Sequence, residues 1–136
     1  NARITNADLA RSVNLSPTPC LERVRRLEAE GYILDYVTLL NPQKLGSGHI
    51  SFIQVQLDRT NPDVFDRFRE EVALCPEVLE CHMVAGGFDY LLKVRTRNML
   101  EYRDFLGVTL ARMSHINQTH TYVVMEEVKA THASPV

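Results

Sequence analysis

The sequence predicts an α+β fold in two parts, a short helix pair followed by an antiparallel sheet that carries two helices on one face. In the first part, apolar residues recur at helical spacing directly after two closely spaced prolines. In the second part, β-prone and helical runs alternate in the order β-α-β-β-α-β. A polar stretch with proline and glycine, residues 41–48, separates the parts, and we place the domains at 1–45 and 46–136.

The N-terminal part begins with two short helices joined by a tight turn. Thr5 or Asn6 is a candidate cap for a helix over residues 7–13, and Asn14 tolerates the positive φ that the turn needs. The hydroxyl of Ser16 can accept from a free amide at the start of the second helix. This arrangement predicts a helix-turn-helix, whereas an ordinary helical hairpin with a solvated charged face is the alternative.

The second helix combines an apolar stripe with a group of arginines. The stripe consists of Cys20, Leu21, Val24 and Leu27, and the arginines off that stripe are Arg23, Arg25 and Arg26. The prolines at its start cost little, because the first amides of a helix have no intrahelical partner. Open amides with cations nearby favour contact with phosphate. The alternative for Arg25 and Arg26 is pairing with glutamates along the same helix.

Two β-prone runs follow the arginine helix. Gly31 is expected to end the helix, because glycine adopts the left-handed conformation that helix ends often need. Residues 32–34 and 36–40 are mostly apolar or aromatic and are separated by Asp35. This pattern predicts a small hairpin or a strand, the wing of a winged helix.

The C-terminal part has four β-prone runs and two helical runs. The strands are expected at 49–57, 78–84, 90–95 and 116–125. Thr60 or Asn61 is expected to cap the first helix and Asn98 the second. The order is that of a ferredoxin-like sandwich, with both helices on one face of the sheet.

The first predicted strand is apolar on both faces. Ile50 and Phe52 share one face, whereas Ile53, Val55 and Leu57 share the other. A sheet with one face in water should alternate more cleanly, so we expect the second face to pack on another subunit. Coverage by the N-terminal segment is the less favoured alternative, because a helix pair is too short to cover a sheet.

Composition and charge narrow the classes of protein. The chain has 136 residues, is 45% hydrophobic and 24% charged, and has three cysteines without CxxC spacing. These values predict a folded, cytoplasmic protein without a membrane span, a disulfide framework or a zinc site. The net charge of −2 is uneven: residues 1–45 carry six Lys+Arg against five Asp+Glu, and residues 46–136 carry nine against twelve. Total charge is therefore a poor guide to nucleic-acid binding.

Catalytic chemistry finds little support in the sequence. The five histidines show no HExxH spacing, and no serine-centred or cysteine-centred motif is present. We expect neither an enzyme nor a metal or other cofactor.

Five blocks in order along nearly the whole chain resemble the Lrp/AsnC family of bacterial and archaeal transcriptional regulators. They are LSPTPCLERVRRLEAEGYI (15–33), LLNPQKLG (39–46), PDVFDRF (62–68), ECHMVAGGFDYLLKVRT (80–96) and TYVVMEEVK (121–129). The resemblance implies a winged helix-turn-helix, a ligand-sensing βαββαβ domain, a small amino-acid effector and dimers that assemble further, often to octamers. It also implies a cytoplasmic, nucleoid-associated protein. Family members usually have one more helix before the position of Asn1, so we expect a fragment that lacks this first helix.

The resemblance and the helix chemistry together predict the residues that bind double-stranded DNA. They are Arg11, Ser16, Thr18, Pro19, Arg23, Arg25 and Arg26. Thr18 and Pro19 are expected near base edges or phosphates in the major groove, and Arg23 and Arg26 are expected at phosphate or guanine. Arg25 is the weaker candidate.

The effector site is predicted around a glycine pair. Gly86 and Gly87 let a ligand approach the backbone, so their amides can bind a carboxylate, and Asp89 can accept from an ammonium group. The full set is Met83, Val84, Gly86, Gly87, Asp89, Met99, Tyr122, Val123 and Val124. A plain hairpin turn capped by Asp89, with Met83 and Val124 in an interface core, is the alternative.

The leading hypothesis is a transcriptional regulator that responds to leucine or methionine. In the family, the effector pocket lies between dimers, so its occupancy can change assembly and DNA affinity. One alternative is a stand-alone amino-acid-binding and oligomerisation module without DNA binding. Another is an allosteric domain from a metabolic enzyme, against which the arginine helix argues.

Overall fold

The computed structural model describes residues 17–58, 61–113 and 115–132 of the chain. The chain divides into two compact units, Asn1–Asn41 and Pro42–Val136. The predicted helix over 7–13, the turn at Asn14 and the cap at Ser16 lie outside the described residues. The predicted domain boundary between residues 45 and 46 stays a prediction.

The first unit contains helix α2, Pro17–Ala29, which begins at the first of the two prolines. The predicted apolar stripe is confirmed, because Cys20 is 2% exposed and Leu21, Val24 and Leu27 are half-buried. Gly31 ends the helix with φ at 82°, as predicted. The amides of Gly31 and Tyr32 donate to the carbonyls of Glu28 and Leu27 at 3.1 and 2.8 Å, which satisfies two free carbonyls of the last turn.

The predicted hairpin or strand over residues 32–40 is wrong for the single chain. These residues have no regular secondary structure, and most of their large apolar side chains are exposed. A β-prone run becomes a strand only when its backbone groups find a partner strand. None of the described residues of the chain provides that partner.

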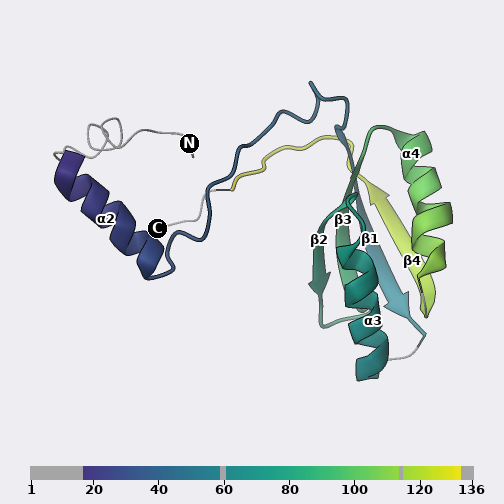
Figure 1. The fold of residues 1–136 in the computed structure, drawn as a ribbon. Coiled ribbons are helices and arrows are strands. Elements are labelled where there is room, and N and C mark those ends of the chain that lie inside the picture. The colour runs from purple at the N-terminus through teal and green to yellow at the C-terminus, as the bar shows by residue number, and fades with distance from the viewer. Residues whose placement is uncertain (1–16, 59–60, 114, 133–136) are drawn as a thin grey trace. The chain divides into compact units, whose positions relative to one another are not determined.

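The second unit is a four-stranded antiparallel sheet with helices on one face (Figure 1). Its elements are β1 (His49–Leu57), α3 (Pro62–Ala73), β2 (Val78–Met83), β3 (Tyr90–Thr96), α4 (Met99–Asp104), a π-helical turn η1 (Phe105–Thr109), a 3₁₀ turn η2 (Leu110–Arg112) and β4 (Ile116–Val123). The strand order β2-β3-β1-β4 confirms the ferredoxin-like arrangement. Strand β1 pairs antiparallel with both β3 and β4.

Side-chain caps start both α-helices of this unit. The side chain of Asn61 accepts from the amide of Val64 at 3.0 Å, and that of Asn98 accepts from the amide of Glu101 at 2.9 Å. Asn61 rather than Thr60 is therefore the cap of α3. Each cap satisfies one of the free amides of a first helical turn.

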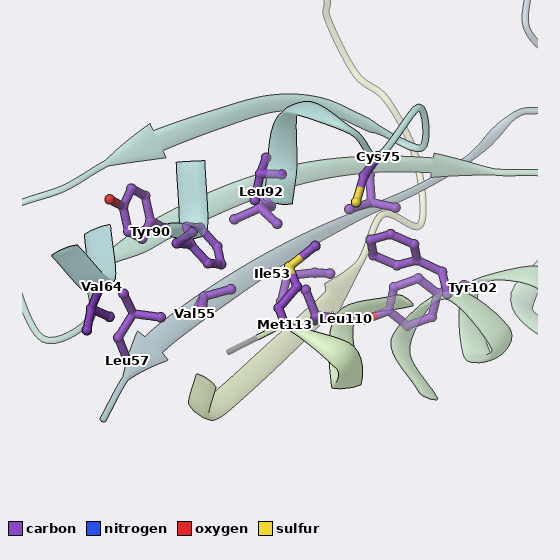
Figure 2. Close-up of a cluster of buried hydrophobic side chains, with 14 residues drawn as sticks. Ile53, Val55, Leu57, Val64, Cys75, Tyr90, Leu92, Tyr102, Leu110 and Met113 are labelled. Atoms are coloured by element: carbon purple, nitrogen blue, oxygen red, sulfur yellow. The ribbon is translucent and has the colours of Figure 1, made fainter. Parts of the chain in front are cut away.

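The core lies between the helices and one face of the sheet (Figure 2). Ile53, Val55 and Leu92 are fully buried in the central strands, and Phe68 of α3 and Tyr102 of α4 pack against the same face. Removing one such aliphatic side chain from water contributes about 1.5–3 kcal/mol. The central strands of this face, β1 and β3, position the residues at both ends of the candidate site.

The opposite face of the sheet carries no helix among the described residues of this unit. Strand register places Phe52 between Lys93 of β3 and Tyr122 of β4, and Gln54 between Leu91 and His120 on the same face. Tyr122 is 55% exposed. The face is therefore mixed, with an apolar group at its centre and polar residues beside it.

Candidate functional site

The start of α2 presents polar and cationic side chains to solvent. Thr18 and Pro19 are exposed in the first turn, and so are Arg23, Arg25 and Arg26 further along. Within the described part of the chain, none of these arginines forms an ion pair, so the alternative of pairing along the helix is not what the structure shows. Arg11 and Ser16 lie outside the described residues.

One contact at the end of α2 escaped the sequence analysis. The hydroxyl of Tyr36 donates to Glu28 Oε1 at 2.9 Å, and this hydrogen bond raises the pKa of Tyr36. This hydrogen bond engages the carboxylate of Glu28, the glutamate that follows Arg25 and Arg26. It also links the segment after α2 to the helix. Residues eight apart across a helix end follow no periodic pattern, so no sequence signal indicated it.

The loop between β2 and β3 is fastened to the end of β1. The amide of Val84 donates to the carbonyl of Asp89 at 3.0 Å, and the amide of Asp89 donates to the carbonyl of Val55 at 3.0 Å. The amide of Leu57 donates to Asp89 Oδ2 at 2.8 Å. The carboxylate of Asp89 thus holds the end of β1, and its second oxygen has no partner in the described part of the chain.

The glycine pair of this loop is open to solvent. Gly86 and Gly87 are both exposed, and a Cβ built on either would meet no atom within 4 Å. Neither has a positive φ; the described glycines that do are Gly31 and Gly46. The turn itself therefore does not need glycine here, and the missing side chains leave the backbone accessible to a ligand.

The predicted effector residues fall at two ends of the sheet. Met83, Val84, Gly86, Gly87 and Asp89 lie where β1 ends, because Met83 pairs with Tyr90, and Tyr90 pairs with Val55. Tyr122, Val123 and Val124 lie where β1 begins: Val123 pairs with Ser51, and the amide of Val124 donates to the carbonyl of Ile50 at 2.9 Å. Met99 is also at that end. One chain does not bring the two groups together.

Where β1 begins, His49 contacts residues of two other elements, β3 and α4. Its Nε2 lies 2.9 Å from Met99 Sδ, and its Nδ1 lies 3.2 Å from Thr96 Oγ1. The ring of His49 lies 6.1 Å from that of Tyr102, whose hydroxyl is hydrogen-bonded to Thr121 Oγ1. Burial raises the pKa of Tyr102. Of this cluster, only Met99 was predicted from the sequence as a site residue.

A hollow of about 480 Å³ lies on α4 beside this cluster. Its lining residues are Met99, Leu100, Tyr102, Arg103 and Leu106. The sequence predicted a helix after Asn98 but not the hollow. A possible signal was the pair of large apolar residues, Met99 and Leu100, at the start of this helix.

The cysteines and acidic groups form no metal centre in the part of the chain that the structure describes. No group of three His, Cys, Asp or Glu residues there is placed to hold a metal ion. The three cysteines are free, and burial raises the pKa of Cys75 and of Cys81. Among the described helices, none is long and apolar enough to cross a membrane.

Comparison with known families gives two matches that follow the two parts of the chain. Residues 50–134 match the Lrp/AsnC ligand binding domain, and residues 1–33 match a winged helix-turn-helix DNA-binding domain.

Comparison with individual proteins gives relatives that cover most of the chain. A leucine-responsive regulatory protein of Haemophilus influenzae is 52% identical over 131 residues, which is 96% of this chain and 79% of that protein. The protein of the same name from Escherichia coli is 53% identical over 129 residues, 95% of this chain and 79% of that protein.

Two solved structures have the same fold over nearly the whole chain. A transcriptional regulator of Neisseria meningitidis in complex with L-methionine has a TM-score of 0.93 and 35% identity, covering 99% of this chain and 87% of that one. An AsnC family regulator of Agrobacterium tumefaciens has a TM-score of 0.93 and 32% identity, covering 99% and 88%.

Proposed function

This chain belongs to the Lrp/AsnC family of transcriptional regulators, and from that premise we propose that its DNA affinity responds to an apolar amino acid, leucine or methionine. The observation that carries the proposal is the exposed arginine helix α2 in the same chain as an open, anchored glycine loop. The helix can contact DNA, and the loop can bind the zwitterion of an amino acid. The protein acts in the cytoplasm, at the nucleoid.

Helix α2 binds in the major groove of DNA. Thr18 and Pro19 approach base edges or phosphates from the first turn of the helix. The two prolines in this turn fix the backbone geometry of the helix start. Arg23 and Arg26 reach phosphate or guanine, and Arg25 contributes less. Arg11 and Ser16 remain predicted contacts. In a two-fold dimer, two such helices read half-sites about one helical turn apart.

The loop at the end of β1 binds the backbone of the effector. The amides of Gly86 and Gly87 bind the carboxylate, and the free oxygen of Asp89 accepts from the ammonium group. Met83, which is half exposed, and Val84 provide apolar contact. The Neisseria relative with L-methionine bound supports an amino acid of this size and polarity.

Assembly links the two activities. The apolar centre of the open sheet face, around Phe52 and Tyr122, packs on a second copy of the chain, and the dimers assemble further, to octamers. Met99, Tyr122, Val123 and Val124 reach an effector held at the loop only if a second copy supplies them. Occupancy of the loop then shifts assembly and, with it, DNA affinity.

Salt-dependent DNA binding tests this function. A duplex selected from a random pool is titrated with wild-type protein, with R23Q/R26Q and, as a matched control in the sheet unit, with R69Q. Each arginine that contacts phosphate should contribute about one unit to the slope of log K against log salt. A two-fold dimer carries each arginine twice, so R23Q/R26Q should lower the slope by about four when both arginines contact phosphate. If the protein were a stand-alone effector-binding module, no duplex would be selected from the random pool. That result would refute the proposed function as a DNA-binding regulator.

A further inference from the structure

His115 has a backbone conformation that is unusual for a residue with a side chain. Its φ is 65°, and no other non-glycine residue of the described chain has a positive φ. Histidine is among the residue types that tolerate this conformation best, but it is strained there relative to glycine. Such a residue persists only where its surroundings fix it, and strained residues of this kind cluster at functional sites.

Asp58 holds His115 through two contacts. His115 immediately precedes β4, and Asp58 immediately follows β1. The amide of Asp58 donates to the carbonyl of His115 at 2.8 Å, and Asp58 Oδ1 lies 3.2 Å from His115 Nδ1. The first contact joins the two backbones, whereas the second requires both side chains. Together they form a clamp, the Asp58–His115 clamp, across the ends of the two strands.

The ring of His115 borders a hollow of about 190 Å³ beside the start of α3. The lining residues of this hollow are His115, Asn61, Asp63, Val64 and Arg67. Asn61 is already engaged, because its side chain accepts from the amide of Val64. Since there is open space next to the ring, packing holds the ring only in part. The contact with Asp58 is therefore needed to keep the side chain of His115 in place.

The clamp lies one residue away from the contact that orients the effector loop. The amide of Leu57 donates to Asp89 Oδ2 at 2.8 Å. The register of β1 against β4 shifts between Gln56 and Leu57, so the regular ladder is interrupted there. The direction of the Leu57 amide consequently depends on how the next residue, Asp58, is held.

We propose that His115 is a positioning residue for effector recognition. Through Asp58 it fixes the end of β1, and the amide of Leu57 at that end aims the free oxygen of Asp89 at the ammonium group of the amino acid. The inference rests on the proposed function, in which Asp89 accepts from that group. Removal of the side chain of His115 releases the strain and the clamp together. Effector affinity should therefore fall without a matching loss of stability.

Calorimetry of the full chain with L-methionine, and with L-leucine in parallel, tests this role. H115G relieves the strain and removes the ring, so we expect an unchanged or higher Tm together with about fivefold weaker binding, the usual effect of one lost hydrogen bond. H115N should restore binding to within about twofold of the wild type, because asparagine tolerates the left-handed conformation and can place an amide nitrogen near the position of Nδ1. D58A should match H115G in affinity. R67Q changes another residue of the same hollow and is the matched control, which should bind as the wild type does.

The outcomes distinguish this inference from the proposed function. Wild-type affinity in H115G, or equal weakening in H115G and H115N, would overturn the positioning role. If D89N binds weakly while H115G binds as the wild type does, positioning by His115 is refuted and Asp89 stays the acceptor of the ammonium group. Wild-type affinity in D89N, or no binding of either amino acid by the wild type, would refute both the inference and the proposed effector site.

Discussion

At the scale of single residues, Asp89 has two roles that use different oxygens of one carboxylate. Oδ2 accepts from the amide of Leu57, which belongs to a buried residue, and the other oxygen is available to an effector. The first role is structural and the second is the proposed recognition of an ammonium group. The two roles can be separated by the choice of substitution.

Asp89→Asn keeps an oxygen for the Leu57 amide and removes the charge, whereas Asp89→Ala removes both. We expect D89A to lower the free energy of unfolding by about 1–3 kcal/mol, because a buried amide loses its acceptor, and D89N to lower it far less. Both should lose most of the thermal stabilisation by leucine or methionine. Urea unfolding and thermal shifts measure the two effects. A D89N protein that responds to these amino acids as the wild type does would remove Asp89 from the effector site.

Glu80 gives a prediction for pH. Its Oε1 lies 3.0 Å from His82 Nε2 and its Oε2 lies 3.6 Å from Lys93 Nζ. The hydrogen bond with His82, followed by the charge of Lys93, lowers the pKa of Glu80. A carboxyl with a lowered folded-state pKa adds stability above its unfolded value of about 4.3, and loses it as the pH falls through the folded value.

Because Glu80 is half exposed, its interactions with His82 and Lys93 contribute only a few tenths of a kcal/mol to the free energy of unfolding at neutral pH. Glu80→Gln should therefore be slightly less stable than the wild type at pH 7, and this difference should shrink as the pH falls toward 3. Urea unfolding at both values checks this. A stability difference that grows toward pH 3 would contradict the assigned direction.

Single-residue roles were predictable only where chemistry and local position coincide. The loop residues Gly86 and Asp89 stand out by type and adjacency, so the sequence indicated them. The bond from Leu57 to Asp89 joins residues 32 apart and depends on how β1 meets the loop. Neither spacing nor composition carries that information.

At the scale of elements, α2 depends on how it ends. Gly31 has φ at 82°, and the amides of Gly31 and Tyr32 satisfy carbonyls of the last turn. A residue with a Cβ is strained at this φ even though the space around Gly31 is open.

Gly31→Ala should therefore destabilise the helix unit by about 1 kcal/mol. Gly107→Ala is the matched control, since Gly107 lies in a helical turn without a positive φ and with open space around it, and should be neutral or stabilising. Thermal unfolding followed by circular dichroism compares them. Equal effects of the two substitutions would show that the left-handed conformation of Gly31 is not needed.

Regular elements of the sheet unit were predicted well because their signals are local. The predicted strand over 49–57 has the bounds of β1, and Asn61 and Asn98 cap their helices as expected. The predicted strand over 32–40 was wrong because its pairing partner is not among the described residues of the chain. The π-helical turn of Phe105–Thr109 was not predicted, because an ordinary helical period describes its residues equally well.

At the scale of the whole molecule, the proposed switch needs more than one chain. The predicted effector residues occupy both ends of β1, and the open sheet face has an apolar centre around Phe52 and Tyr122. Assembly of copies would cover that centre and bring residues of different chains near one ligand. Sequence alone predicted the need for a partner but not the division of the site between two ends.

The most direct test measures DNA affinity and amino-acid affinity on the same protein. Fluorescence anisotropy with the selected duplex is recorded with and without leucine or methionine, and amino-acid binding is measured by calorimetry with and without the duplex. We expect the better of the two amino acids to change DNA affinity by about fivefold or more, and the duplex to change the affinity for that amino acid by the same factor. D89N should lose both changes and keep its DNA binding. DNA affinity that stays constant while an amino acid demonstrably binds would contradict the proposed regulation.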